Sequence, residues 1–173
     1  EPFFWTFCDD YIELVKNRAH GSGGEGPATS ARAALAIALD TQLRLLAPYL
    51  PFATEEVWSW WREGSVHGQA WPTAEPLRAA AAGQEAALLR VVSDVIVNVR
   101  KVKSDAKVSQ KTPILRATLA LPEASAVMFE GARADVTSLG SIEQLDIASP
   151  EGVTGIELRG VELGEPPVKT PRK

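Results

Sequence analysis

The chain has 173 residues, of which 45% are hydrophobic and 23% charged, and its formal net charge is −4. This hydrophobic content excludes a disordered chain, and no apolar stretch reaches the roughly 20 residues that span a bilayer. The single cysteine, Cys8, excludes an internal disulfide, and with His20 and His67 it gives no zinc-ligand spacing. We therefore expect a soluble globular protein without a metal and without contact with membranes. The single cysteine is compatible with a reducing compartment, and we expect the protein to be cytoplasmic and monomeric.

The start of the chain carries no secretory signal, because no charged segment followed by an apolar one opens it. It begins at Glu1, without Met, and helical periodicity follows at once. We interpret the first residue as a cut through a longer protein.

A first helix is predicted from Pro2 to about Arg18, because proline suits a first turn and apolar residues follow at steps of three and four. A Gly-rich loop, GSGGEGP, then covers residues 21–27. Its glycines match G-x-G-x-x-G, but a helix precedes the loop and Pro27 follows, so we reject dinucleotide binding. The predicted apolar face of the first helix consists of Phe4, Cys8, Tyr11 and Val15.

Two further helices are expected before residue 62. Thr29 or Ser30 caps the first of them, and Pro48 and Pro51 end it. Thr54 caps the second, with Glu55 and Glu56 in its first turn. The first of these helices carries a seam of Leu35, Leu39, Leu43 and Leu46. An irregular stretch follows over residues 62–76.

The pattern changes from helical to mixed near residue 103. A long helix is predicted from Ala79 to Val102, with an apolar seam at Leu88, Val92, Val95, Val99 and Val102. Alternating or β-branched runs then predict strands, and Gly140 ends a helix between them. These elements are a strand over 114–121, a helix over 124–139, and strands over 142–147 and 153–163.

The predicted fold class is mainly α with an α/β appendage. An antiparallel helical bundle is expected over residues 1–103, a small α/β subdomain over 104–165, and a flexible tail over 166–173. No catalytic constellation is present: the sequence has no G-x-S-x-G elbow, no P-loop and no H-E-x-x-H.

One segment concentrates positive charge. From Arg90 to Arg116 there are seven basic and two acidic residues, a net charge of +5, against −9 for the rest of the chain. Cations one turn apart on a helix suit successive phosphates of a nucleic acid, whereas a solvated helix end is the alternative. If the long helix continues, the predicted RNA-binding row is Arg100, Lys103 and Lys107, with Lys111 and Arg116 extending it and Lys16 and Arg18 forming a second patch.

We expect replacement of Arg100, Lys103 or Lys107 by Ala to weaken RNA binding, with little change in melting temperature.

Tryptophans offer a second means of binding RNA, because aromatic rings stack on unpaired bases. Trp5 and Trp58 lie at apolar helix positions and are expected in the core. Trp60 and Trp61 are harder to assign, and Trp71, in the irregular stretch, is the best stacking candidate.

The segment LRLLAPYLPFATEEVW, residues 43–58, resembles the anticodon-binding helical domain of class I aminoacyl-tRNA synthetases. Its leucine-rich helix, P-x-x-P-F kink and T-E-E followed by an apolar residue and Trp are shared by the valine, isoleucine and leucine enzymes. FCDDYIELVKNR, residues 7–18, is most similar to the valyl enzymes, as are GSVHGQAWP (64–72) and the run over 96–107. The resemblance covers about the first 115 residues well and the rest loosely.

The resemblance implies a tRNA-binding domain of a valine–tRNA ligase, whose parent attaches valine to its tRNA with ATP and Mg²⁺. Both class I catalytic signatures, HIGH and KMSKS, are absent from this chain. We therefore expect it to be inactive alone, to hold no cofactor, and to have tRNA, most simply valine tRNA, as its partner. In the family, further helices upstream of this region supply much of the anticodon contact, so we expect base-reading residues there. Many bacterial valyl enzymes end in a coiled-coil arm that this sequence does not show, either because it was trimmed or because the parent lacks it.

Two alternatives stay open at this point. The domain could come from an isoleucyl or leucyl enzyme, which FCDDYIELVK disfavours. It could also be a helical interaction module that binds no RNA, which the basic segment disfavours.

Overall fold

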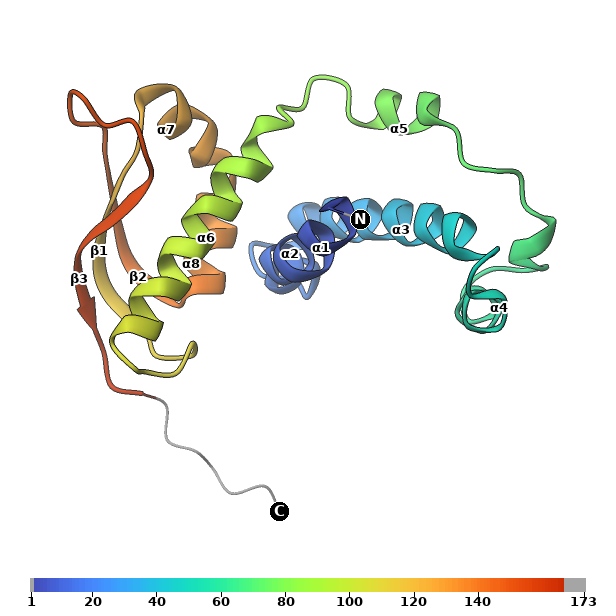
Figure 1. Ribbon diagram of the computed structural model, residues 1–173, viewed down its shortest axis with the longest axis horizontal. Helices are drawn as coiled ribbons and strands as arrows, with labels where there is room; N and C mark the ends of the chain where they lie inside the picture. The colour runs from blue at the N-terminus through green and yellow to red at the C-terminus, as the bar shows by residue number, and fades with distance from the viewer. Residues whose placement is uncertain (1, 167–173) are drawn as a thin grey trace, which may run out of the picture. The chain divides into compact units, whose positions relative to one another are not determined.

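The structure, a computed structural model, describes residues 2–166 and is mainly helical with one three-stranded sheet (Figure 1). This confirms the coarse fold class. Contacts divide the chain into two compact units, unit 1 (Glu1–His20 with Glu85–Lys173) and unit 2 (Gly21–Gln84). Unit 1 contains residues on both sides of the expected boundary between 103 and 104, so the division into domains stays a prediction. The expected tail from residue 167 onward lies outside the described residues.

The first helix of unit 1 is continuous but changes type. It comprises α1 (Pro2–Trp5), the π-helical segment η1 (Thr6–Tyr11) and α2 (Ile12–Ala19). A π-turn takes an extra residue, so it rotates the preceding residues away from the face that continues in α2. The prediction that Trp5 is a core residue is therefore wrong: its side chain is 57% exposed.

The sheet of unit 1 consists of β1 (Ile114–Ala120), β2 (Ile142–Ala148) and β3 (Glu157–Leu163). Their order is β2-β1-β3, with β2 parallel and β3 antiparallel to the central strand β1. The parallel pair requires a crossover, which the helices between β1 and β2 supply. The three predicted strands are confirmed, although the third begins at Glu157 and not at Val153.

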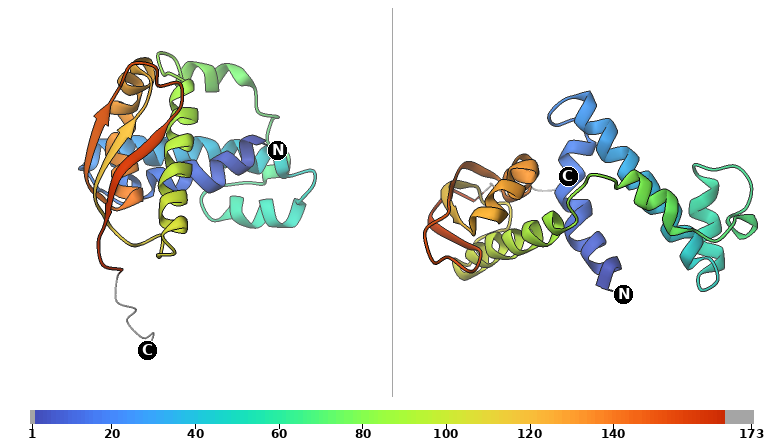
Figure 2. Two further views of the ribbon diagram at one scale, coloured as in Figure 1. Left: turned by 60° about the vertical axis from the view of Figure 1, so that its left-hand side comes forward. Right: turned by 90° about the horizontal axis from the view of Figure 1, so that it is seen from above.

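Helices form the second layer of this unit, on one face of the sheet (Figure 1, Figure 2). They are α6 (Ala87–Asp105), α7 (Glu123–Phe129) and α8 (Arg133–Gly140). The sequence predicted one helix over 124–139. The structure instead interrupts it with the 3-10 turn η3 (Glu130–Ala132), at the centre of which lies Gly131, a poor helix former.

Unit 2 contains α3 (Glu25–Leu46), α4 (Pro51–Ser59), the 3-10 turn η2 (Val66–Gly68) and α5 (Ala74–Ala80). These helices begin earlier than predicted. α3 starts after Gly24, whose φ of 95° requires glycine, so neither Thr29 nor Ser30 is a cap. α4 starts at Pro51, which needs no N–H partner in the first turn.

Two further helix predictions are wrong for local reasons. Thr54 is not a cap, because it lies inside α4 and its Oγ1 donates to the Leu50 carbonyl at 2.9 Å. The long helix does not begin at Ala79, because α5 ends at Ala80 and Gly83, with a φ of 78°, separates it from α6. The predicted irregular stretch 62–76 therefore contains η2 and the start of α5.

Unit 2 has its own small core around Trp58, which is 4% exposed. Leu43 from α3 and Val66 from η2 are buried with it, and Val57 and Trp61 pack against them. The Trp58 and Trp61 rings meet edge to face, with centroids 6.2 Å apart. The expected burial of Trp58 is confirmed.

We predict that Trp58→Ala lowers the free energy of unfolding by about 3–5 kcal/mol, the usual cost of deleting a large buried aromatic. Trp60→Ala is the matched control, two residues along and 70% exposed. It should change stability by no more than about 0.5 kcal/mol. Chemical denaturation followed by circular dichroism measures both values, and equal losses for the two variants would contradict the assignment of Trp58 to the core.

Candidate nucleic-acid interface

The basic segment lies at the C-terminal end of α6, and its central lysine points inward. Lys103 follows Val99 by one helical turn on the buried face of α6 and is 1% exposed. Its Nζ donates to the Gly140 carbonyl at 2.7 Å and to the Gln110 carbonyl at 2.9 Å. Burial lowers the pKa of the Lys103 ammonium. The prediction that Lys103 contacts phosphate from an exposed face is therefore wrong.

Gly140 allows this contact by ending α8 close to α6. A Cβ there would lie 2.9 Å from Ile142 Cγ1 and 3.4 Å from Val99 Cγ1, so a larger residue would force the elements apart. The Gly140 carbonyl belongs to the last turn of α8, where carbonyl groups lack partners within the helix. The Lys103 ammonium bonds this carbonyl and complements the negative end of the helix dipole.

α6 stops before Lys107, so the predicted row is not continuous. The Lys107 N–H donates to the Ser104 carbonyl at 2.9 Å and the Val108 N–H to the Lys103 carbonyl at 3.1 Å. This pair of bonds is a Schellman motif, with Lys107 in the left-handed conformation at a φ of 54°. Arg100, Lys103 and Lys107 therefore do not share one helical face.

Three of the predicted cations are already paired within unit 1. Arg100 Nη1 lies 3.1 Å from Asp10 Oδ1 and its Nη2 donates to the Asp9 carbonyl at 2.9 Å. Arg18 Nη2 lies 3.0 Å from Asp135 Oδ2, which joins α2 to α8. Lys16 Nζ lies 3.2 Å from Glu13 Oε1 on the surface of α2.

The remaining predicted cations are Lys107, Lys111 and Arg116. Arg116 is exposed on β1, whereas Lys107 and Lys111 lie in the loop between α6 and β1, residues 106–113, which we call the lysine loop. Both are exposed, and neither has an ion pair within residues 2–166. Exposed ammonium groups without a carboxylate partner can neutralise phosphates with the smallest desolvation cost. A phosphate-binding role for them stays a prediction.

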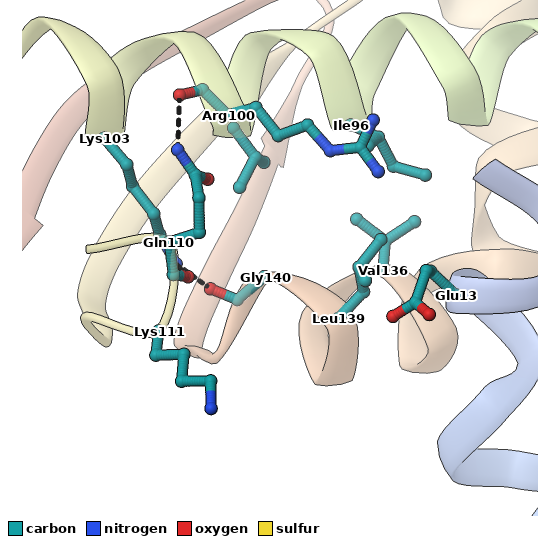
Figure 3. Close-up of a pocket in the computed structure, with 10 residues that line it drawn as sticks. Glu13, Ile96, Arg100, Lys103, Gln110, Lys111, Val136, Leu139 and Gly140 are labelled. Atoms are coloured by element: carbon teal, nitrogen blue, oxygen red, sulfur yellow. Dashed lines mark hydrogen bonds between the residues drawn. The ribbon is translucent and has the colours of Figure 1, made fainter. Parts of the chain in front are cut away.

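A cavity of about 260 Å³ lies beside the lysine loop, between α2, α6 and α8. Its walls are aliphatic and its rim is polar (Figure 3). Sequence reasoning missed Glu13 and Gln110, because nothing in the local pattern of either residue indicates a cavity that forms only where α2, α6, α8 and the lysine loop meet. The lining residues of this cavity are Glu13, Ile96, Val99, Arg100, Lys103, Gln110, Lys111, Val136, Leu139 and Gly140.

The exposed tryptophans belong to unit 2. Trp71 is 60% exposed and Trp60 is 70% exposed, whereas Trp61 is half-buried with Arg62 Cζ 4.5 Å from its ring centroid. Trp71 has the accessibility that base stacking requires, and that role stays a prediction.

Two further features bear on other kinds of site. Among the described residues, no group of three or more His, Cys, Asp or Glu side chains is placed to hold a metal ion. No helix in the part of the chain that the structure describes has the length and hydropathy to cross a bilayer.

Comparison with known proteins gives the family. A family profile described as the anticodon-binding domain of tRNA ligase matches residues 1–119. The chain therefore belongs to the family of anticodon-binding domains of tRNA ligases, which confirms the resemblance seen in the sequence.

More particularly, the chain is similar along most of its length to curated valine–tRNA ligases. The enzyme of Cutibacterium acnes is 46% identical over 98% of this chain and 19% of its own length. The enzyme of Bifidobacterium longum is 43% identical over 99% of this chain and 21% of its own length. That of Thermobifida fusca is 54% identical over 69% of this chain and 13% of its own length. The chain thus spans no more than about a fifth of the length of these relatives.

We predict that Lys103→Met lowers the free energy of unfolding by about 2–4 kcal/mol, because it leaves the Gly140 and Gln110 carbonyls without their shared donor. Lys111→Met, the same substitution at an exposed position, should be nearly neutral. Denaturant titrations of both variants test this. A destabilisation by Lys111→Met as large as that by Lys103→Met would contradict a special role of the buried ammonium.

A pH-dependent effect is expected at Asp135, where burial outweighs the Arg18 guanidinium and raises the carboxyl pKa above its ordinary value of 3.8. Above pH 3.8 the Asp135 carboxyl keeps its proton in the folded chain, whereas it has lost the proton in the unfolded chain. The stability that the protonated carboxyl contributes is therefore fully present below pH 3.8 and is lost as the pH rises through the raised pKa.

The Asp135→Asn variant has no carboxyl group at this position that could lose a proton. The stability of the variant relative to the unmodified chain should therefore increase from acid to neutral pH. Asp146→Asn, the same chemical change at an exposed position, is the control. Urea unfolding across that pH range measures the difference. A relative stability of Asp135→Asn that falls with pH would mean that the Arg18 ion pair outweighs burial.

Proposed function

We propose that this chain binds valine tRNA as the anticodon-binding domain of a valine–tRNA ligase. The observation that carries the proposal is the family profile over residues 1–119, together with valine–tRNA ligases as relatives along nearly the whole chain. The whole enzyme would join valine to its tRNA with ATP and Mg²⁺, and no cofactor is proposed for this chain itself. The isoleucyl and leucyl alternative is not favoured by these relatives.

The proposal also covers the packing of the helices, the oligomeric state and the cellular location. We expect the helices within residues 1–103 to pack as an antiparallel bundle and the protein to act as a monomer in the cytoplasm. Binding would combine phosphate contacts from the lysine loop with base contacts elsewhere. The unpaired charge of Lys107 and Lys111 supports the first part of this division.

The decisive experiment compares valine tRNA with a non-cognate tRNA over a series of salt concentrations. Salt-dependent binding that favours valine tRNA is the expected result, because phosphate contacts give the salt dependence and base contacts give the preference. Binding without preference would restrict the chain to phosphate contacts. No binding by the folded chain would overturn the proposal.

Lys107→Gly separates tRNA binding from stability. Glycine adopts the left-handed conformation of residue 107 without strain, so the variant should gain roughly 1 kcal/mol of unfolding free energy. It should also bind tRNA more weakly, with a slope of log affinity against log salt that is smaller by about 0.7–0.9 for one lost phosphate contact. Thermal melting and filter binding give the two values.

Ser141→Gly is the matched control, because Ser141 has a similar φ of 49° at the end of α8 but carries no charge. It should gain comparable stability and leave the salt slope unchanged. An unaltered salt slope in Lys107→Gly would remove Lys107 from the interface.

A further inference from the structure

We propose that a groove along the outer edge of β2 binds an extended, basic segment of a partner protein as a fourth strand of the sheet. The groove lies in unit 1, between β2 and α8. The proposal goes beyond the proposed function and does not depend on it. Carboxylates that repel phosphate line the groove, so its partner is a polypeptide and not RNA.

The groove follows the edge of β2 and does not lie over one face of the sheet. β2 is an outer strand, with β1 between it and β3, so within the described residues one side of its backbone has no strand beside it (Figure 1). Five consecutive residues of β2, 142–146, line the groove. Successive side chains of a strand point to opposite faces, so consecutive residues line one groove only where it runs along the edge.

The groove has room for an extended peptide. Its volume is about 560 Å³, within the range of roughly 300–1,000 Å³ for ligand pockets. Its second wall is helical and consists of Arg133, Ala134 and Thr137 of α8. A strand added to the edge of a sheet gains main-chain hydrogen bonds from the sheet, and pockets beside that edge select its side chains. The helical wall of α8 provides the second of these contributions.

A backbone acceptor of β2 can be reached from this groove. Arg133 Nη2 donates to the Leu145 carbonyl, so a donor that lies in the groove bonds the strand directly. The same guanidinium lies with its Nη1 3.1 Å from Glu130 Oε1. This carboxylate offsets the charge of Arg133, so the guanidinium does not make the groove basic.

The other outer strand, β3, is a poorer template for a partner. Its pairing with β1 contains two register shifts, and Gly160 within it has a φ of 58°. β2, in contrast, keeps one register with β1 from Gln144 to Ala148. Irregular pairing at an outer strand hinders the addition of a further strand. The regular edge of β2 is therefore the edge that accepts a partner.

The charges of the groove select a basic partner. Glu143 and Asp146 line it with exposed side chains, and neither carboxylate has an ion pair within residues 2–166. The Gln144 amide donates a long hydrogen bond, 3.4 Å, to Asp146 Oδ2. Opposite charges on neighbouring strands stabilise their pairing, and like charges destabilise it. A strand with lysine or arginine side chains fits this edge, whereas a second copy of β2 would bring carboxylates together.

The test uses a fluorescein-labelled peptide, TKVKVKT, which has the seven-residue length of β2. Its fluorescence anisotropy should rise on titration with the chain, and TEVEVET should not bind. Added salt should weaken the binding, because the contacts between lysine and carboxylate groups are exposed. No rise with TKVKVKT at chain concentrations up to about 1 mM would overturn the proposal.

Methylation of peptide nitrogen atoms tests strand addition itself. Alternate N–H groups of an extended peptide point to opposite sides, so only one alternate set can pair with β2. Methylation of that set should abolish binding, and methylation of the other set should leave it. The unmethylated peptide should also slow the amide hydrogen exchange of β2. Equal affinities of the two methylated peptides would overturn strand addition.

Reversal of charge locates the site on β2. The double variant Glu143→Lys with Asp146→Lys should bind TKVKVKT about fivefold or more weakly and should bind TEVEVET. The matched control, Glu157→Lys with Glu162→Lys, reverses two exposed carboxylates of β3 and changes the net charge equally. It should leave the affinity within about twofold.

Two further outcomes would overturn the proposal. Equal weakening by the two double variants would mean that net charge alone attracts the peptide. A chain that forms dimers, detected by sedimentation, and does not bind the peptide would assign the edge of β2 to a second copy.

Discussion

The Lys103 ammonium donates to the carbonyl that ends α8 and to a carbonyl of the lysine loop. Three separate segments of unit 1 thereby meet at one buried charge. A buried ammonium is costly unless its donors are used, and the unpaired carbonyl groups at the end of a helix are suitable acceptors. This bond fixes the lysine loop against α8, and it fixes one wall of the cavity relative to another.

The positive charges of the basic segment fall into two groups with different roles. Lys103 and Arg100 bind backbone and carboxylate groups of their own unit, so their charges stabilise the fold. Lys107 and Lys111 lie beyond the end of α6, in a loop with no carboxylate partner for either among residues 2–166. The positive charge available to a ligand is therefore smaller than the composition indicates.

Periodicity and turn residues were enough to predict the strands and most helices, because those elements depend on local pattern. The inward direction of Lys103 was also readable in principle, since it continues the buried seam of Val92 and Val99 by one more turn. A charged residue type argued against that interpretation, and only its distant acceptor, Gly140, justifies it. The cavity could not be predicted, because Glu13 and Leu139 meet there through tertiary packing alone.

The same bond network holds the lysine loop against α6. Lys111 and Gln110 are adjacent in the chain, and Gln110 is bonded both to Lys103 and to the Arg100 backbone. A phosphate held at Lys111 would therefore bind to a loop that is already ordered, with little loop entropy left to lose. Phosphate is attracted less strongly by a chain with a net charge of −4, so an interface that is already ordered is an advantage to it.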